Sequence, residues 1–132
     1  MRAEARTAAR RTRGAAARLS GRRREVLAAI LLMLKGYRVL GFRLRTPQGE
    51  LDLVAVKRRV LAVVEVKSRG SIEAALEAVG PPQRERLRRA GRELAARRPG
   101  LKGLSVRLDL MAFAKDAWPR HIADAWSDDS PG

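Results

Sequence analysis

Apolar and polar residues change along the chain with the periods of helices and strands, and the pattern predicts a single α/β domain. An uncharged apolar run over residues 26–34 predicts a buried helix that has Ser20 as its N-cap and ends at about Lys35, before Gly36. Three strands are predicted next, over residues 37–45, 51–56 and 60–67. The short polar segments between these strands indicate hairpin turns.

The second half of the chain predicts two more helices and a last strand. A short helix is expected over residues 72–79, and Gly80-Pro81-Pro82 ends it. A longer helix follows over residues 83–98, with apolar residues on one face. Alternating apolar residues over 105–113 predict a final strand. The order α-β-β-β-α-β predicts a mixed central sheet flanked by helices.

The charge balance indicates a polyanionic partner. Lys and Arg number 29 against 14 Asp and Glu, which leaves a formal net charge of +15 in 132 residues. This excess excludes an ordinary acidic metabolic enzyme and favours nucleic-acid binding, although a GC-rich genome also yields an Arg-rich composition. The chain has no Cys and one His, which excludes disulfides, thiolate zinc sites and multi-histidine metal sites.

The distribution of these charges predicts a three-part organisation. Residues 1–19 are rich in Arg and lack apolar periodicity, so we expect a disordered basic arm; a transit peptide is the alternative. Residues 20–126 are expected to form one domain, and residues 127–132 a flexible tail. The longest apolar run is less than half of the ~20 residues that cross a bilayer, so no membrane span is expected, and we predict a cytoplasmic location.

Charged residues interrupt two of the apolar strands. Glu50 and Asp52 share one strand face, as do Glu65 and Lys67 on the next strand. If Lys57 lies opposite Val60 in the hairpin, the register places Asp52 opposite Glu65 and Glu50 opposite Lys67. Directly opposed Cβ atoms lie about 4.5–5.5 Å apart, so two carboxylates could hold one cation. A three-residue loop would instead place the pairs on opposite faces.

Two interpretations of these charges remain open at this point. Burying a charge on an apolar strand is costly unless the charge is paired or binds a metal. The alternative is a solvated sheet face that carries a cross-strand ion pair.

Several short motifs extend over most of the predicted domain. They are Glu25-x-x-Ala28-x-x-x-Leu32-x-x-x-Gly36-Tyr37, Gly49-Glu50-Leu51-Asp52-Leu53, Val64-Glu65-Val66-Lys67-x-Arg69, Glu77-Ala78-Val79 and Arg107-Leu108-Asp109. Over about residues 21–126 the chain resembles the YraN-like family of bacterial proteins, which looks like a member of the PD-(D/E)xK superfamily. The resemblance implies a restriction-endonuclease-like fold and a nuclease site at Asp52, Glu65 and Lys67, with Glu25 as an additional acid.

The implied chemistry suits the residue types. Asp52 and Glu65 would hold Mg²⁺ or Mn²⁺ through oxygen atoms, and Lys67 would steady the attacking water or the charge that grows on the phosphate. Glu50 is either an outer metal ligand or the partner of Lys67. Glu25 joins the site only if its helix packs along the sheet edge; otherwise it is an ordinary first-turn acid.

Two positions depart from the family pattern, which commonly has Asn where this chain has Arg43 and Lys where it has Gln83. Because Asp52, Glu65 and Lys67 match the family pattern, we expect these two departures to alter substrate contacts more than metal binding. Six arginines are expected to follow DNA phosphates, namely Arg43, Arg45, Arg69, Arg84, Arg88 and Arg92.

Four other residues with functional side chains are interpreted as structural. Asp109 is expected to pair with Arg107, and His121 to be a surface or hydrogen-bonded histidine. Trp118 and Trp126 are expected to pack in the core.

The predicted function is a metal-dependent DNA endonuclease, or a Holliday-junction-resolvase-like enzyme, in DNA repair or recombination. A non-catalytic DNA-binding scaffold with the same fold is the main alternative, and an RNA-associated or ribosome-associated basic protein is a weaker one. Resolvase-like cutting of two strands would require a homodimer.

Overall fold

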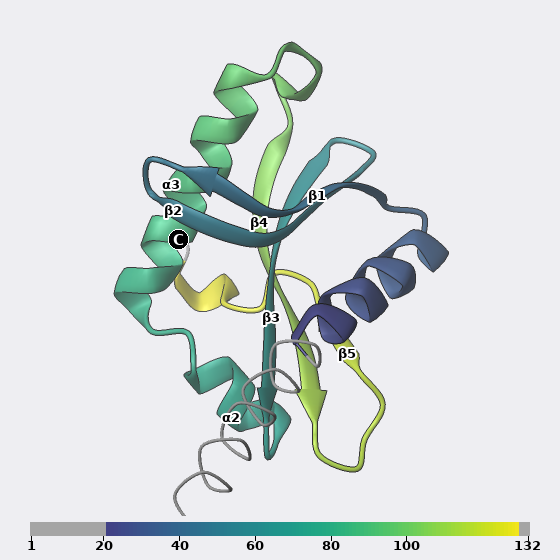
Figure 1. Ribbon diagram of the computed structural model, residues 1–132. Coiled ribbons are helices and arrows are strands. Elements are labelled where there is room, and N and C mark those ends of the chain that lie inside the picture. Colours follow the sequence, from purple (N-terminus) through teal and green to yellow (C-terminus); the bar gives the residue numbers. More distant parts are fainter. Residues whose placement is uncertain (1–20, 130–132) are drawn as a thin grey trace, which may run out of the picture.

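The computed structural model describes residues 21–129, and the predicted arm and Ser20 cap lie outside this range. Five strands form one mixed sheet in the order β1-β2-β3-β4-β5. The helices lie on its two sides, and the β1–β2 hairpin crosses the long strands β3 and β4 (Figure 1). This arrangement confirms the predicted α/β class and the restriction-endonuclease-like core.

The N-terminal helix occupies residues 21–34 of the described range. It ends as predicted at Gly36, whose φ of 94° lies in the left-handed region that favours glycine. The backbone N–H of Gly36 donates to Met33 O at 3.0 Å, and that of Tyr37 to Leu32 O at 3.0 Å. These bonds satisfy two of the last helical carbonyls and turn the chain into the first strand.

The three predicted strands form two consecutive hairpins. Their bounds are β1 Arg38–Thr46, β2 Gly49–Lys57 and β3 Val60–Arg69. Lys57 pairs with Val60, which is the predicted register, and the ladder continues to Leu53 opposite Val64. Arg58 has a φ of 56° in the two-residue turn, a conformation that primed hairpin turns require.

The connection from β3 to β4 (Ser105–Ala114) contains α2 (Ile72–Glu77), α3 (Pro81–Arg97) and a 3₁₀ turn over Pro99–Leu101. Because this connection crosses the sheet, β3 and β4 are parallel. The predicted break between the two helices is present, but it ends at Gly80, because Pro81 is the first residue of α3. Proline is tolerated there, since the first helical N–H groups have no intrahelical acceptor.

Two features after β4 were not predicted. A fifth strand, β5 (Arg120–Ile122), pairs antiparallel with β4. Residues Ser127–Asp129, expected to be part of a flexible tail, form a 3₁₀ turn behind the buried Trp126. Trp118 was expected in the core but is 90% exposed.

The sheet separates two hydrophobic cores. Helices α2 and α3 cover one face, where Leu61, Val63 and Leu110 are buried. The N-terminal helix covers the other face through Ala28 and Leu32. The prediction that this helix is buried was therefore only half right, because its outer side carries large apolar residues that are exposed.

Candidate active site

The candidate site lies where β2 and β3 separate. Their ladder stops at Leu53 and Val64, one position before Asp52 and Glu65 would pair. There Asp52 Oδ2 accepts a hydrogen bond from the backbone N–H of Val66 at 3.1 Å. The side chain of Asp52 thus replaces the next backbone acceptor of the ladder, which fixes the carboxylate beside β3.

Glu65 is the buried member of this pair. Its exposed fraction is 3%. Burial raises the pKa of Glu65 to about 8, and both the negative charge of Asp52 and a carboxyl–carboxyl hydrogen bond with Asp52 act in the same direction. Lys67 acts in the opposite direction, and its Nζ lies 3.9 Å from Glu65 Oε2. The single positive charge of Lys67 therefore does not neutralise the two neighbouring carboxylates of Asp52 and Glu65.

A pocket of about 320 Å³ opens beside these residues. Its lining comes from residues 21–25 of the N-terminal helix, from β2 and from the end of β3. The lining residues are Gly21, Arg24, Glu25, Asp52, Val66, Lys67, Ser68 and Arg69. The pocket thus brings carboxylates and cations together at the point where the two strands part.

Glu25 reaches this pocket because its helix packs along the sheet, which was the condition for its joining the site. Its carboxylate is engaged, however, with Arg43 Nε 3.1 Å from each carboxylate oxygen. Arg43 occupies one of the two positions that depart from the family pattern. The structure therefore gives this arginine a partner within the protein at the edge of the pocket.

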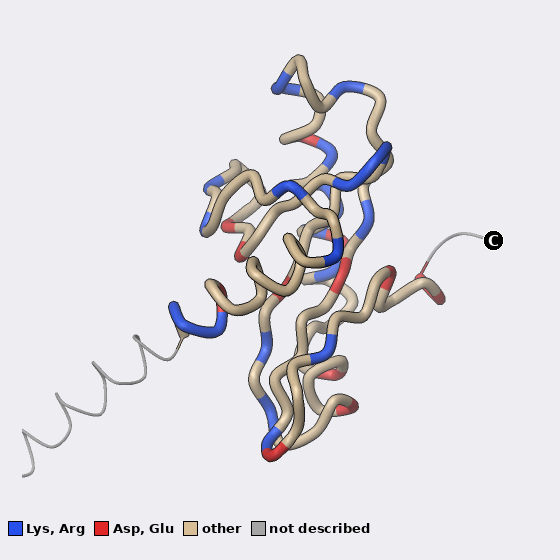
Figure 2. Tube along the Cα trace, turned by 90° about the vertical axis from the view of Figure 1, so that its right-hand side faces the viewer, with Lys and Arg blue, Asp and Glu red and all other residues tan. Residues whose placement is uncertain are grey.

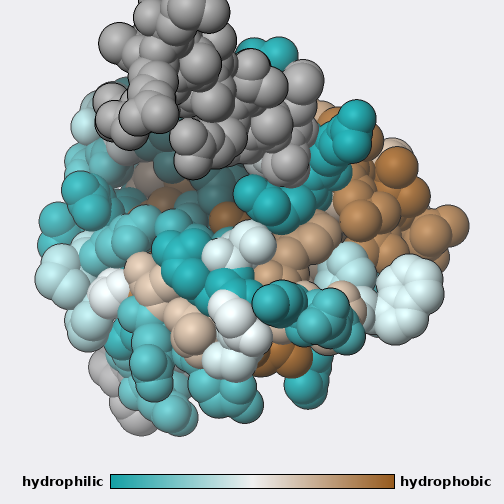
Figure 3. Space-filling model, turned by 60° about the horizontal axis from the view of Figure 1, so that its bottom comes forward, coloured by the Kyte–Doolittle hydropathy of each residue, from teal (hydrophilic) through white to brown (hydrophobic). Residues whose placement is uncertain are grey.

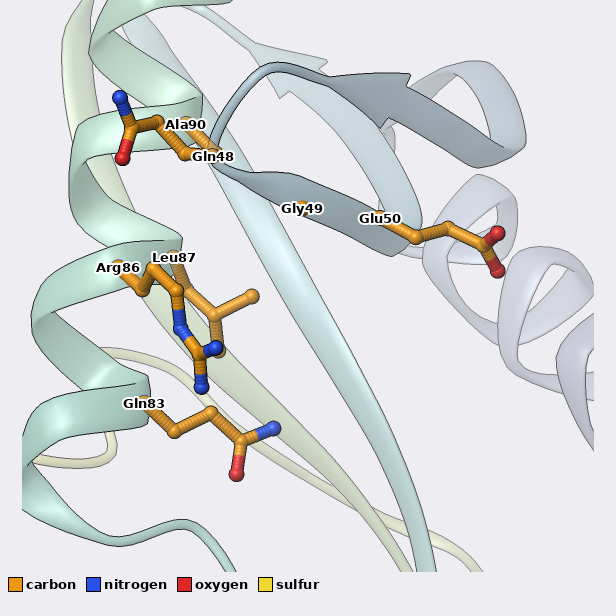
Figure 4. Close-up of a pocket in the computed structure, with 7 residues that line it drawn as sticks. All are labelled: Gln48, Gly49, Glu50, Gln83, Arg86, Leu87 and Ala90. Atoms are coloured by element: carbon orange, nitrogen blue, oxygen red, sulfur yellow. The ribbon is translucent and has the colours of Figure 1, made fainter.

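Glu50 is separated from the other carboxylates. It pairs with Arg45 of β1 in the strand ladder and lines a different pocket, of about 200 Å³, together with Gln83 and Arg86 of α3. In Figure 4 its carboxylate points away from the α3 side chains. Of the two roles predicted for Glu50, that of a partner for Lys67 is not seen in the structure, since Lys67 forms its ion pair with Glu65.

The donor set at Asp52 and Glu65 suits a hard divalent cation. Mg²⁺ is usually held by one or two carboxylates, with waters and substrate phosphates at the remaining positions. Residues 21–129 contain no group of three or more acidic or histidine side chains placed to hold a metal. Asp52 and Glu65 would thus be the protein ligands, and Glu25 and Glu50 would contribute only after moving.

The predicted phosphate-binding arginines differ in their surroundings. Arg45, Arg69 and Arg92 are exposed. Arg84 and Arg88 both contact the carboxylate of Asp129, at 2.7 Å and 3.0 Å, so they hold the C-terminal segment against α3. Basic positions are spread over the upper part of the molecule, over the first described residues of the N-terminal helix and along the lower part of the trace (Figure 2).

Arg24 also lines the pocket, although it was not predicted as a site residue. A signal for it was present in the sequence, because three consecutive arginines follow the predicted N-cap Ser20. Positive charge there opposes the helix dipole, so a function other than helix stability was indicated.

A second polar cluster, distinct from this pocket, surrounds Asp109. The fully buried carboxylate accepts bonds from Arg107 Nε and lies next to His121 Nε2, both at 2.8 Å. Burial alone would raise the pKa of Asp109, but hydrogen bonds from Arg107, His121 and the backbone N–H of Asp124 lower it below its ordinary value. The predicted pairing of Asp109 with Arg107 is confirmed, and His121 is a hydrogen-bonded histidine.

Within the described part of the chain, every helix is too short or too polar to span a bilayer. The mixed sheet, with an Asp, a Glu and a Lys at the point where two antiparallel strands separate, defines a restriction-endonuclease-like α/β protein.

Comparison with known proteins assigns the chain to a family of this class. The model of the Uncharacterised protein family UPF0102, the YraN family, matches residues 24–113, so the chain belongs to that family. A UPF0102 protein of Caulobacter sp. (strain K31) is 66% identical over 121 residues, which cover 92% of this chain and 87% of the relative. A UPF0102 protein of Parvibaculum lavamentivorans is 52% identical over 113 residues, covering 86% and 85% of the two chains.

Proposed function

We propose that this protein is a metal-dependent endonuclease that hydrolyses phosphodiester bonds of DNA, with branched DNA of repair or recombination as its substrate. The observation that carries the proposal is the grouping of Asp52, the buried Glu65 and Lys67, of which Asp52 and Lys67 line one pocket. A carboxylate pair with a nearby ammonium group has little structural purpose on a buried strand, because two adjacent carboxylates repel each other. The same grouping is useful in phosphodiester hydrolysis, which needs a cation site next to a phosphate site.

Each residue has a role that follows from its position. Asp52 and Glu65 would hold Mg²⁺ or Mn²⁺, and such an ion, when bound, polarises a phosphoryl oxygen and lowers the pKa of a bound water. Asp52 is oriented for this by the N–H of Val66. Lys67, held near Glu65, would stabilise negative charge that develops on the phosphate in the transition state.

The cationic lining of the pocket supports an anionic substrate. Arg24, on the N-terminal helix, and Arg69, at the end of β3, line the pocket together with Asp52. They would bind phosphates that flank the scissile bond without reading the sequence of bases. The net charge of +15 supports a long polyanion over a small phosphorylated molecule. The relatives are bacterial, so the DNA would be that of a bacterial cytoplasm.

Lys67→Ala separates the enzyme from a DNA-binding scaffold. The full chain is incubated with Mg²⁺ or Mn²⁺ and with duplex, flap, single-stranded and four-way-junction DNA, and single-turnover cleavage is measured. Lys67→Ala should lower the cleavage rate by about 10²–10³-fold while DNA affinity stays nearly constant, because the lost interaction acts mainly in the transition state. Lys102→Ala, which removes an exposed lysine far along the chain, is the matched control and should cleave at the parent rate.

Asp52→Ala completes the assay, because it removes a proposed ligand and should abolish cleavage. Two results would refute the proposal. One is cleavage by Lys67→Ala at the parent rate. The other is the absence of cleavage of every substrate by the parent protein while it binds DNA, which would establish the scaffold instead.

A further inference from the structure

The outer face of the N-terminal helix is an apolar surface that the described residues leave uncovered. We define this outer face as Val26, Leu27, Ile30, Met33 and Leu34, with exposed fractions between 41% and 79%. At 3.6 residues per turn they form a stripe about 120° wide, with Ile30 at its centre. Figure 3 shows apolar side chains gathered on the right-hand side of the molecule, where this helix lies.

We propose that the outer face is the interface of a two-fold symmetric homodimer in which the helices of two copies pack antiparallel. The spacing of its residues supports helix packing: positions 26, 30 and 33, and positions 27, 30 and 34, follow the three- and four-residue steps that form ridges on a helix. A helix that is apolar all round belongs in an interior, and here the sheet covers only one side.

The shape of the outer face matches a second copy of itself. A pocket of about 300 Å³ lies at its start, lined by Arg22, Arg23, Val26, Leu27 and Ile30. The most exposed residue, Leu34 at 79%, projects at its other end. With Ile30 on the two-fold axis, Leu34 of one copy faces Val26 of the other, so each copy fills the pocket of its partner. A two-fold interface requires such self-complementarity.

The preceding residues of the chain are a poor alternative cover. Residues 1–20 contain six arginines, and their only large apolar residues are Met1 and Leu19. Such a composition offers too little apolar surface to cover five large side chains.

The dimer has a consequence for the active site that rests on the proposed function. Arg24 and Glu25 of this same helix line each active-site pocket. With Ile30 on the axis, the helical rise and the usual distance between packed helices place the two helix backbones about 20 Å apart at residue 24, and the pockets, on the side of each helix away from the outer face, lie farther apart than this. One dimer would then act on two phosphodiesters of a single branched DNA molecule.

The first test measures the oligomeric state of the full chain by sedimentation velocity from micromolar to submillimolar concentration. The parent should be a dimer. Ile30→Glu should weaken self-association at least about tenfold, because the two introduced carboxylates would meet on the axis. Ile30→Ala serves as a second variant in case the charged one does not fold, and circular dichroism checks both. Ala96→Glu, on the exposed side of α3, is the matched control and should remain dimeric.

The second test uses the absence of cysteine from the chain. A single Ile30→Cys variant should form a covalent dimer under mild oxidation, because residue 30 meets itself at the axis. Leu34→Cys alone should not, whereas Val26→Cys combined with Leu34→Cys should. Ala96→Cys is the control that reports random collision.

The two proposals can fail separately. The dimer is overturned if the parent is monomeric at every concentration, or if Ile30→Glu dimerises as the parent does. It is also overturned if the outer face binds anionic vesicles while the protein stays monomeric. Asp52→Ala should dimerise normally. A dimer without nuclease activity refutes only the proposed function, and cleavage by a monomer refutes only the dimer.

Discussion

Replacing Glu65 with glutamine should stabilise the protein, and the gain should grow with pH. The pKa of Glu65 rises from an ordinary value of 4.5 to about 8 in the folded chain. Between these values the folded state binds a proton that the unfolded state has lost. The free energy of unfolding of the parent therefore falls as pH rises from about 4.5 to about 8. Glutamine is neutral at every pH, so the free energy of unfolding of Glu65→Gln does not fall in this way.

The size of the effect follows from the same two pKa values. One pKa unit corresponds to 1.36 kcal/mol, so the loss approaches roughly 5 kcal/mol above pH 8. This is an upper limit, because water that enters the pocket beside Glu65 would solvate the ionised group. Near pH 4.5 the two proteins should differ only through the altered hydrogen bond with Asp52, which is worth about 1 kcal/mol.

Urea denaturation from about pH 5 to about pH 9, with a chelator present, measures this difference. Glu77→Gln is the matched control, since Glu77 is exposed and has no ion pair among the described residues. Mn²⁺ should restore the stability of the parent at high pH through mass action, because the cation replaces the proton between the carboxylates. Parallel pH profiles for parent and Glu65→Gln would refute the reasoning, since they would mean that Glu65 titrates normally.

Three further predictions concern packing, the second polar cluster and DNA binding. Gly91→Ala should destabilise the protein by about 1–3 kcal/mol in urea, because its Cβ would lie 2.7 Å from Val106 Cγ1 and 2.8 Å from Val63 Cγ2; Gly100→Ala, which meets nothing within 4 Å, should be neutral. Asp109→Asn should lower the free energy of unfolding by about 3 kcal/mol at neutral pH. Because the pKa of Asp109 is lowered in the folded state, the parent should lose this stabilisation in acid, as the folded carboxylate protonates, and the variant should not. Equal dependence of the two unfolding free energies on acid pH would contradict this. Log affinity for duplex DNA should fall with log salt at about −0.9 per phosphate neutralised, and an affinity independent of salt would exclude the DNA-binding surface.

The strands follow from local patterns in the sequence, because alternation along β2 and β3 is a local property. Their register was an assumption, since a three-residue loop would have placed the charged pairs on opposite faces, and the structure confirms the two-residue turn at Arg58 and Arg59. On that assumption Asp52 and Glu65 could be placed side by side, and the resemblance to a family implied their role in a site. Lys67 followed from the same period of two.

The surroundings of that core depend instead on tertiary packing. The β1–β2 hairpin turns across the sheet, so Glu50 lines a different pocket from Asp52, while Glu25, far away in sequence, reaches the pocket of Asp52. Likewise, Arg84 and Arg88 resemble a free basic face in the sequence, yet both bind the C-terminal segment. Such contacts depend on how elements pack over long sequence separations, which no local period encodes. For the same reason, the sequence did not predict which side of the N-terminal helix is exposed. A uniformly apolar run does not reveal which of its sides the sheet will cover.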